Sequence, residues 1–105
     1  MDKKAALEVL CRFKKGIESR SIRIDKLILF GSYATGANRE ESDIDVVVIS
    51  KDFANKGYWE RTEILSDAIY EIFEPIEAVA LTPEEWEKGE SGIVECAKAG
   101  EIVYG

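Results

Sequence analysis

The sequence predicts a small α/β domain, and three observations indicate that fold class. The chain has 105 residues, which is the length of one domain. Its composition, 46% hydrophobic and 33% charged, is typical of a globular protein. Apolar residues at helical spacing alternate along the chain with short apolar runs that have strand character. We therefore expect one domain over residues 1–105, in which helices flank a short β-sheet.

The chain begins with a helix and a strand. Residues 2–19 carry apolar side chains at helical spacing, and Asp2 is expected to cap the N-terminus of this amphipathic helix. The apolar run Lys26–Phe30 ends at Gly31 and predicts the first strand.

Two strands and a helix form the middle of the predicted domain. The β-branched run within Asp43–Ser50 has no polar alternation, which indicates a strand covered on both faces. Tyr58–Phe73 places apolar residues on one helical stripe and stops before Pro75, as the steric restriction before proline requires. Ile76–Leu81 predicts a third strand.

Two short helices follow. Thr82, with proline next and glutamate three residues on, forms a capping box for a helix that we expect to end at Gly89. Ser91 is expected to cap a last helix through Ala99, which Gly100 closes.

The composition excludes several chemistries. The chain has no histidine, which removes Ser-His-Asp triads, Cys-His pairs and histidine-ligated zinc. Cys11 and Cys96 lie too far apart in sequence for a CxxC pair, and two cysteines cannot form a Cys₄ zinc site. We interpret both as buried small hydrophobic residues. Catalysis would depend on carboxylates, hydroxyls, Lys, Arg, Tyr or a metal ion held by oxygen.

Charge and hydropathy restrict the classes of partner that the protein is expected to bind. The net charge is −7, with an excess of Lys and Arg confined to the first 26 residues and an acidic remainder. An acidic body argues against a large nucleic-acid ligand, which needs a basic face. No apolar run approaches the roughly 18 residues of a membrane helix, and the charged N-terminus does not resemble a secretory signal. We expect a cytoplasmic protein that does not enter membranes.

Two aspartates open the second strand. Because strand side chains alternate, Asp43 and Asp45 are expected on one face, followed there by Val47 and Ile49. Paired carboxylates repel unless a cation lies between them, and Mg²⁺ prefers oxygen ligands. The alternative is a solvated acidic start of a strand.

The turn after the first strand could hold phosphate. Gly31 has no Cβ to keep an anion away from the backbone, and the Ser32 hydroxyl adds a donor. An ordinary strand-ending turn is the alternative. Gly31 and Gly36 have the spacing of a P-loop, but the lysine and hydroxyl residue of that motif are absent.

The whole phrase LFGSYATG…SDIDVVV resembles the minimal nucleotidyltransferases (MNT proteins) of the polymerase-β-like superfamily, over essentially the whole chain. That resemblance implies a nucleotidyltransferase domain with a short mixed sheet of three or four strands. It also implies that Gly31 and Ser32 hold a nucleoside triphosphate, and that Asp43 and Asp45 bind one or two Mg²⁺ ions.

The resemblance further implies a third acidic residue on a later strand, for which Glu77 is the candidate as metal ligand or general base. The family more often has aspartate there, and a surface charge is the alternative reading. Many members have arginine where this chain has Thr35. Arg39 could supply that charge to the nucleotide, and Ser42 could orient the aspartates, or both could be ordinary loop residues.

The function implied is transfer of AMP from ATP to a protein hydroxyl, as the antitoxin of a HEPN-type helical toxin. Such a protein would form a hetero-oligomer, with a homodimer as the alternative. The apolar tail Ile102–Tyr104 could meet the partner or pack back on the domain. A second hypothesis is a degenerate module that neutralises the HEPN partner by contact. A third hypothesis is transfer to a small molecule. It requires a second domain that forms the acceptor site, which this chain is expected to be too short to provide.

Overall fold

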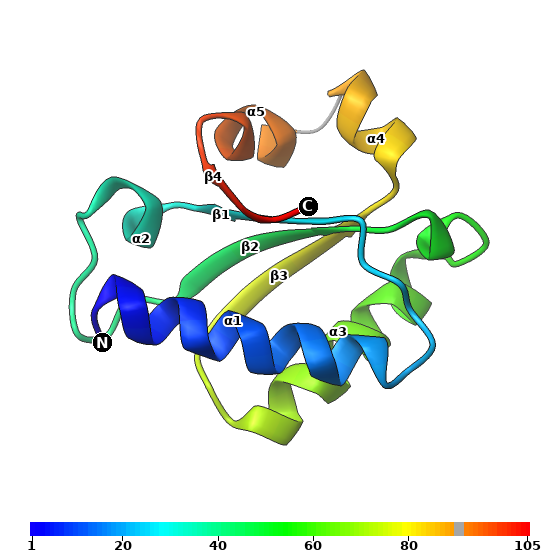
Figure 1. Cartoon of the computed structure of the whole chain (residues 1–105). Helices are drawn as coiled ribbons and strands as arrows, with labels where there is room; N and C mark the ends of the chain where they lie inside the picture. The colour runs from blue at the N-terminus through cyan, green and yellow to red at the C-terminus, as the bar shows by residue number, and fades with distance from the viewer. Residues whose placement is uncertain (90–91) are drawn as a thin grey trace.

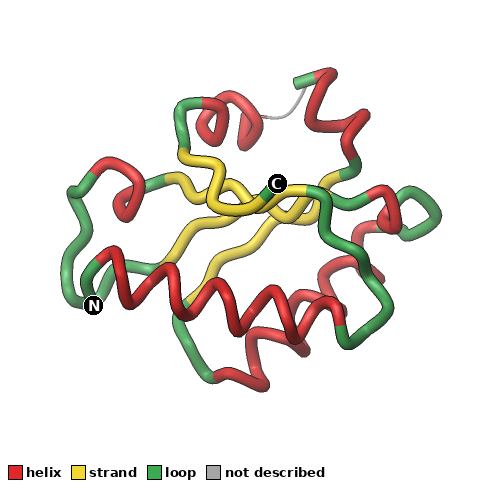
Figure 2. The backbone as a smooth tube through the Cα atoms, viewed as in Figure 1, coloured by secondary structure: helices red, strands yellow, loops and turns green. Residues whose placement is uncertain are grey.

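The computed structural model describes residues 1–89 and 92–105 and confirms the α/β class. Four strands form one mixed sheet in the order β3-β2-β1-β4. Helices lie on both of its faces (Figures 1 and 2). The elements are α1 (Lys3–Glu18), β1 (Lys26–Phe30), α2 (Ser32–Thr35), β2 (Ile44–Ile49), η1 (Lys51–Phe53), α3 (Tyr58–Ile72), β3 (Ile76–Leu81), α4 (Pro83–Lys88), α5 (Gly92–Lys98) and β4 (Glu101–Tyr104). No helix among these described residues is long and apolar enough to span a membrane.

The strands pair in both directions. β1 runs antiparallel to β2 and to β4, whereas β2 and β3 are parallel and are joined through α3. This arrangement gathers the end of β1 and the beginnings of β2 and β3 at one end of the sheet (Figure 1).

Two apolar layers hold the helices on the sheet. The larger layer packs α1 and α3 against one face and includes Phe13, Leu29 and Val48. The smaller layer lies under α4 and α5 and contains Val47, Ile49 and few other buried residues. β2 therefore contributes side chains to both layers, which confirms the prediction of a strand covered on both faces.

The predicted helix caps are confirmed where the structure describes them. The Ala5 N–H donates to the Asp2 carboxylate over 2.8 Å at the start of α1. Thr82 and Glu85 form the reciprocal capping box of α4. The expected cap Ser91 lies outside the described residues.

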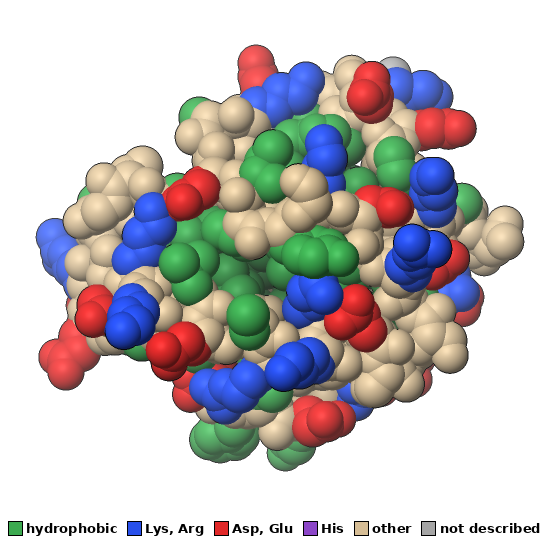
Figure 3. Space-filling view, in the orientation of Figure 1, with side chains coloured by type: hydrophobic (Ala, Val, Ile, Leu, Met, Phe, Trp, Pro, Cys, Tyr) green, Lys and Arg blue, Asp and Glu red, His purple; other side chains and the backbone are tan. Residues whose placement is uncertain are grey.

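The C-terminal tail is a fourth strand, which the predicted element order lacks. β4 pairs with β1, and Val103 packs on the larger core while Ile102 and Tyr104 stay exposed. Gly100 turns the chain against β1, since a Cβ there would come within 3.0 Å of the Phe30 Cβ and closer to backbone carbonyls. Figure 3 shows hydrophobic side chains gathered on this face of the molecule, where α1 and β4 border a groove.

The prediction that both cysteines are buried is wrong. Cys11 and Cys96 are free thiols on exposed positions. α1 buries Leu10 and Phe13, and α5 buries Val94 and Ala97, so each cysteine lies on the solvent side of its helix. Position on the helix outweighs the general tendency of cysteine to be buried.

Replacing Tyr33 with phenylalanine is expected to stabilise the protein. The Tyr33 ring is 1% exposed in the larger core, and its hydroxyl has no hydrogen-bond partner among the described residues. Removing an unsatisfied buried hydroxyl is worth about 1 kcal/mol. Urea unfolding of wild type and Tyr33→Phe should show this gain. A loss of stability would mean that the hydroxyl bonds to a buried water molecule.

Candidate active site

Asp45 lies on β2, between the neighbouring strands β1 and β3, at one end of the sheet. It pairs with Phe30 of β1 on one side and with Glu77 of β3 on the other. Because directly paired residues of a sheet project to the same face, Asp45 and Glu77 lie side by side. The structure thus brings Glu77 and Asp45 together on one face of the sheet.

Gly31 completes this arrangement from the end of β1. Its φ of +72° and ψ of −152° belong to a region that side chains disfavour. A Cβ at this position would collide with the Asp45 carboxylate. Glycine is therefore required here both by the backbone conformation and by the carboxylate that occupies the space.

The carboxylates face a groove of about 410 Å³ at the edge of the sheet. Its lining includes Asp45, Glu77 and Phe30, together with Ser66 and Ile69 from α3. The sequence prediction missed the two α3 residues, since the helical pattern indicates only which stripe of α3 is apolar. The groove is wide enough to admit a ligand to the carboxylates.

Burial together with neighbouring negative charge raises the pKa of Asp45 to about 6, from an ordinary value of 3.8. Burial of the carboxyl group is the largest cause, followed by the charge of Glu77, a hydrogen bond with Glu77 and the charge of Asp43. No lysine or arginine of the described residues forms an ion pair with these three side chains. A divalent cation fits such a set, because it would supply the missing positive charge to oxygen ligands.

The carboxylates of Asp43, Asp45 and Glu77 do not converge on one point. Asp43 is exposed and lies one residue before β2, outside the strand that was expected to begin there. Among residues 1–89 and 92–105, no group of three acidic or cysteine side chains is positioned to hold a metal ion. The three side chains would have to converge to share a cation.

The remaining predicted residues lie on the loop between β1 and β2. Ser32 begins α2 directly after Gly31 and is half-buried. The Ser42 hydroxyl accepts a hydrogen bond of 2.8 Å from the Arg39 N–H, which closes the turn before Asp43. The Arg39 side chain is exposed. Thr35 donates to the Ser32 carbonyl over 3.3 Å and so stabilises α2.

Replacing Asp45 with asparagine is expected to stabilise the metal-free protein at neutral pH. The folded pKa of about 6 lies above the ordinary 3.8, so ionisation favours the unfolded chain. The penalty develops between roughly pH 4 and 6 and is complete above that range. With allowance for solvent screening, Asp45→Asn should gain about 1 kcal/mol at pH 7.5 and less at pH 4.

Urea unfolding at the two pH values measures this difference, with Asp43→Asn as the control. Asp43 is exposed, so its substitution should change stability less. Loss of stability in Asp45→Asn at pH 7.5 would show that Asp45 makes a favourable contact in the folded protein.

The fold and the carboxylate-bearing end of the sheet define a nucleotidyltransferase-type domain. The chain belongs to the nucleotidyltransferase domain family, whose model matches residues 10–97. The matched region contains every candidate site residue named above, which confirms the resemblance derived from the sequence.

Two curated proteins of Methanocaldococcus jannaschii are similar to parts of the chain. "Putative protein adenylyltransferase MJ0141" is 45% identical over 47 residues, which cover 44% of this chain and 48% of that protein. "Putative protein adenylyltransferase MJ0604" is 63% identical over 27 residues, or 26% of this chain and 27% of that protein. The matches therefore span about half and about a quarter of these relatives.

Solved structures share the fold. A structure described as "a putative nucleotidyltransferase from Sulfolobus solfataricus" aligns with a TM-score of 0.72 at 18% identity, over 95% of this chain and 80% of that one. A toxin-antitoxin structure with AMP-PNP aligns with a TM-score of 0.57 at 19% identity, over 100% of this chain and 74% of that one. The mixed four-stranded sheet flanked by helices is thus a known nucleotidyltransferase architecture.

Proposed function

We propose that this protein transfers AMP from ATP to a hydroxyl group of another protein, as the antitoxin of a pair with a HEPN-type toxin. The observation that carries the proposal is the position of Asp45, which lies against Gly31 on one side and Glu77 on the other. The names of the two similar proteins, each printed as "Putative protein adenylyltransferase", support a protein acceptor. The structural likeness to a toxin-antitoxin complex with AMP-PNP supports the nucleotide and the partner.

Each residue has a role in this proposal. Gly31 leaves room for the Asp45 carboxylate beside the turn that would receive the triphosphate, and the Ser32 hydroxyl would donate to a phosphate oxygen. Asp43, Asp45 and Glu77 would hold Mg²⁺, which supplies positive charge to the triphosphate when bound. Arg39 and Ser42 would contact the nucleotide from the loop.

Glu77 would also accept the proton of the acceptor hydroxyl. The hydroxyl oxygen forms a bond to the α-phosphorus, and the bond from that phosphorus to the bridging oxygen of the β-phosphate breaks. The products are an AMP ester of the acceptor and pyrophosphate.

One observation favours a second function, neutralisation of the HEPN partner by contact alone. The three carboxylates do not form a ready group of ligands in the described residues. The family resemblance also implies an arginine in many members where this chain has Thr35. A chain that kept the loop but lost transfer would still bind its partner.

Transfer is tested with ATP labelled at the α-phosphate, Mg²⁺, the purified protein and lysate of its host. We expect a labelled protein band that disappears with the double variant Asp43→Ala/Asp45→Ala and with ATP labelled at the γ-phosphate. If a known partner is present and remains unlabelled, the enzyme proposal fails and the contact mechanism remains.

A further inference from the structure

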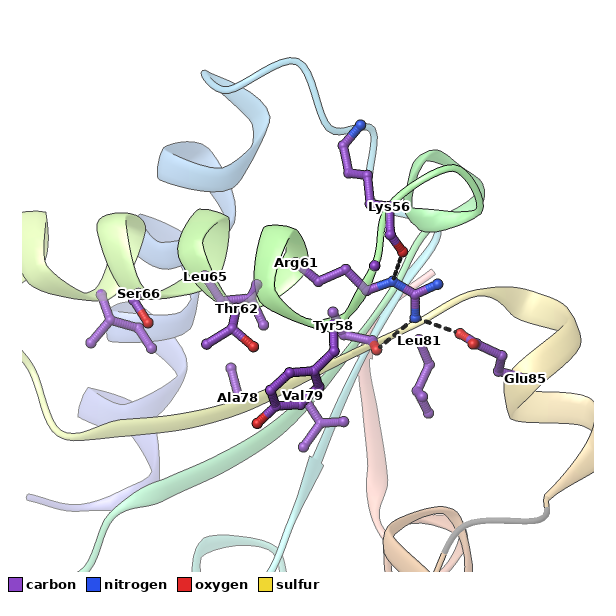
Figure 4. A pocket seen from close by; sticks show the side chains of 13 residues that line it. Lys56, Tyr58, Arg61, Thr62, Leu65, Ser66, Ala78, Val79, Leu81 and Glu85 are labelled. Atoms are coloured by element: carbon purple, nitrogen blue, oxygen red, sulfur yellow. Dashed lines mark hydrogen bonds and ion pairs between the residues drawn. The ribbon is translucent and has the colours of Figure 1, made fainter.

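A second groove, called the edge groove below, runs along the β3 edge of the sheet. It has a volume of about 550 Å³ and lies between α3 and β3. Figure 4 shows Tyr58, Thr62 and Ser66 on the side of α3 that borders this groove, with Ala78 and Val79 of β3 opposite them. Neither the proposed nucleotide site nor the carboxylates account for this space.

The strand that borders the groove has an edge that no other described strand pairs with. β3 is the terminal strand of the described sheet and pairs only with β2 there. The Ser50 N–H donates to the Leu81 carbonyl over 3.0 Å, so Leu81 directs its carbonyl toward β2. Backbone directions alternate along a strand, which places the N–H and C=O of Ala78 and Ala80 on the open side. Arg61 donates to the Ala80 carbonyl from that side over 3.4 Å.

The edge groove continues into the groove that contains the carboxylates. The two share lining residues from both elements, namely Ser66, Ile69, Ala78 and Val79. Asp45 and Glu77 lie at the far end, next to the beginning of β3. A ligand that follows β3 along its edge therefore reaches the proposed reaction centre.

The chemistry of the edge groove indicates which kind of ligand it binds. A row of outward backbone donors and acceptors is complementary to an extended polypeptide, which adds to a sheet edge as a further strand. The small side chains of Ala78 and Ala80 leave space over the strand. Apolar lining from Tyr58, Leu65 and Ile69 suits apolar side chains of the added strand.

We propose that the edge of β3 binds an extended segment of the acceptor protein as a fifth strand, and so presents a Ser, Thr or Tyr hydroxyl to Asp45 and Glu77. This inference depends on the proposed function, since it names how the acceptor binds. The transfer step is unchanged: the hydroxyl oxygen bonds to the α-phosphorus, pyrophosphate leaves, and Glu77 takes the proton. Edge-to-edge pairing of two copies of this chain is the competing use of the same strand.

Ala78→Pro tests the inference, because proline removes the outward N–H of Ala78 and none of the bonds to β2. Proline is tolerated at such edge positions. Ser66→Arg is a second variant, which places a long charged side chain at the junction of the two grooves from an exposed position on α3. Glu63→Arg is the matched control, since Glu63 is exposed on α3 and lines neither groove.

Each variant is assayed for transfer from α-labelled ATP to protein in host lysate, and for binding of a fluorescent ATP analogue with Mg²⁺. We expect Ala78→Pro and Ser66→Arg to lower transfer at least about tenfold and to leave nucleotide binding within about twofold of wild type. Glu63→Arg should match wild type in both. If Ala78→Pro does not fold, transfer by Ser66→Arg alone decides whether the acceptor binds at the edge of β3.

Three outcomes would overturn the inference. Transfer at the wild-type level in Ser66→Arg or in folded Ala78→Pro would show that the acceptor does not use this edge. Absence of transfer in the wild type would remove the proposed function itself and the acceptor role with it. A wild-type dimer in sedimentation that Ala78→Pro converts to a monomer would assign the edge to a second copy.

Discussion

Gly31→Ala is expected to reduce nucleotidyl transfer strongly and to destabilise the protein. The φ of +72° places the residue where a Cβ is strained, and that Cβ would also collide with the Asp45 carboxylate. Strain of this kind costs about 1–3 kcal/mol. The collision forces Asp45 away from the position it shares with Glu77, so transfer should fall at least about 100-fold. Urea unfolding and the α-labelled ATP assay measure the two effects separately.

Gly36→Ala is the matched control for that substitution. Gly36 also has a positive φ, +83°, and lies on the same loop, but a Cβ there would contact nothing within 4 Å. Its alanine variant should lose about 1 kcal/mol of stability from backbone strain and retain transfer. Equal activity in the two variants would contradict the placement of Gly31 against Asp45.

Glu77→Gln is expected to lower the rate of transfer about 100-fold or more, because the amide can neither accept the proton of the acceptor nor offer an anionic ligand. The register that pairs Glu77 with Asp45 is the reason for expecting so large an effect at an exposed position. Glu77→Asp keeps the carboxylate and should retain much more of the rate. Initial rates with α-labelled ATP measure both.

The control for the charge change is Glu87→Gln, on an exposed position of α4 away from the carboxylates. It should leave the rate unchanged. A wild-type rate in Glu77→Gln would mean that Glu77 is a surface charge at the strand edge, which was the alternative reading of the sequence.

The end of the sheet that bears the candidate site could be predicted from local sequence. Asp45 precedes Val47 and Ile49 in the same alternation by which Glu77 precedes Val79 and Leu81. Parallel strands with matching patterns pair in register, and in the structure Asp45 and Glu77 are partners. The capping box of α4 was equally clear, because its residues act on one another within four positions.

Features that depend on distant contacts could not be predicted. β4 has only four residues, and it forms because β1, more than 70 positions earlier, offers it an edge. The edge groove was missed for the same reason, since Ser66 and Ala78 meet only after α3 packs beside β3. Nor does a sequence pattern show that Asp43 stays outside the strand.

The unequal apolar layers on the two faces of the sheet have a consequence for native-state dynamics. The layer beneath α4 and α5 buries little, and α4 contributes no buried residue to it. Sections of a fold with few buried apolar contacts open at a lower free energy than global unfolding, so α4 and α5 form a region of low local stability. Asp45 and Val47 project to this side of the sheet. Because Ile93 of α5 lines the groove at the carboxylates, local opening of α5 would reshape that groove while α1, α3 and the sheet remain folded.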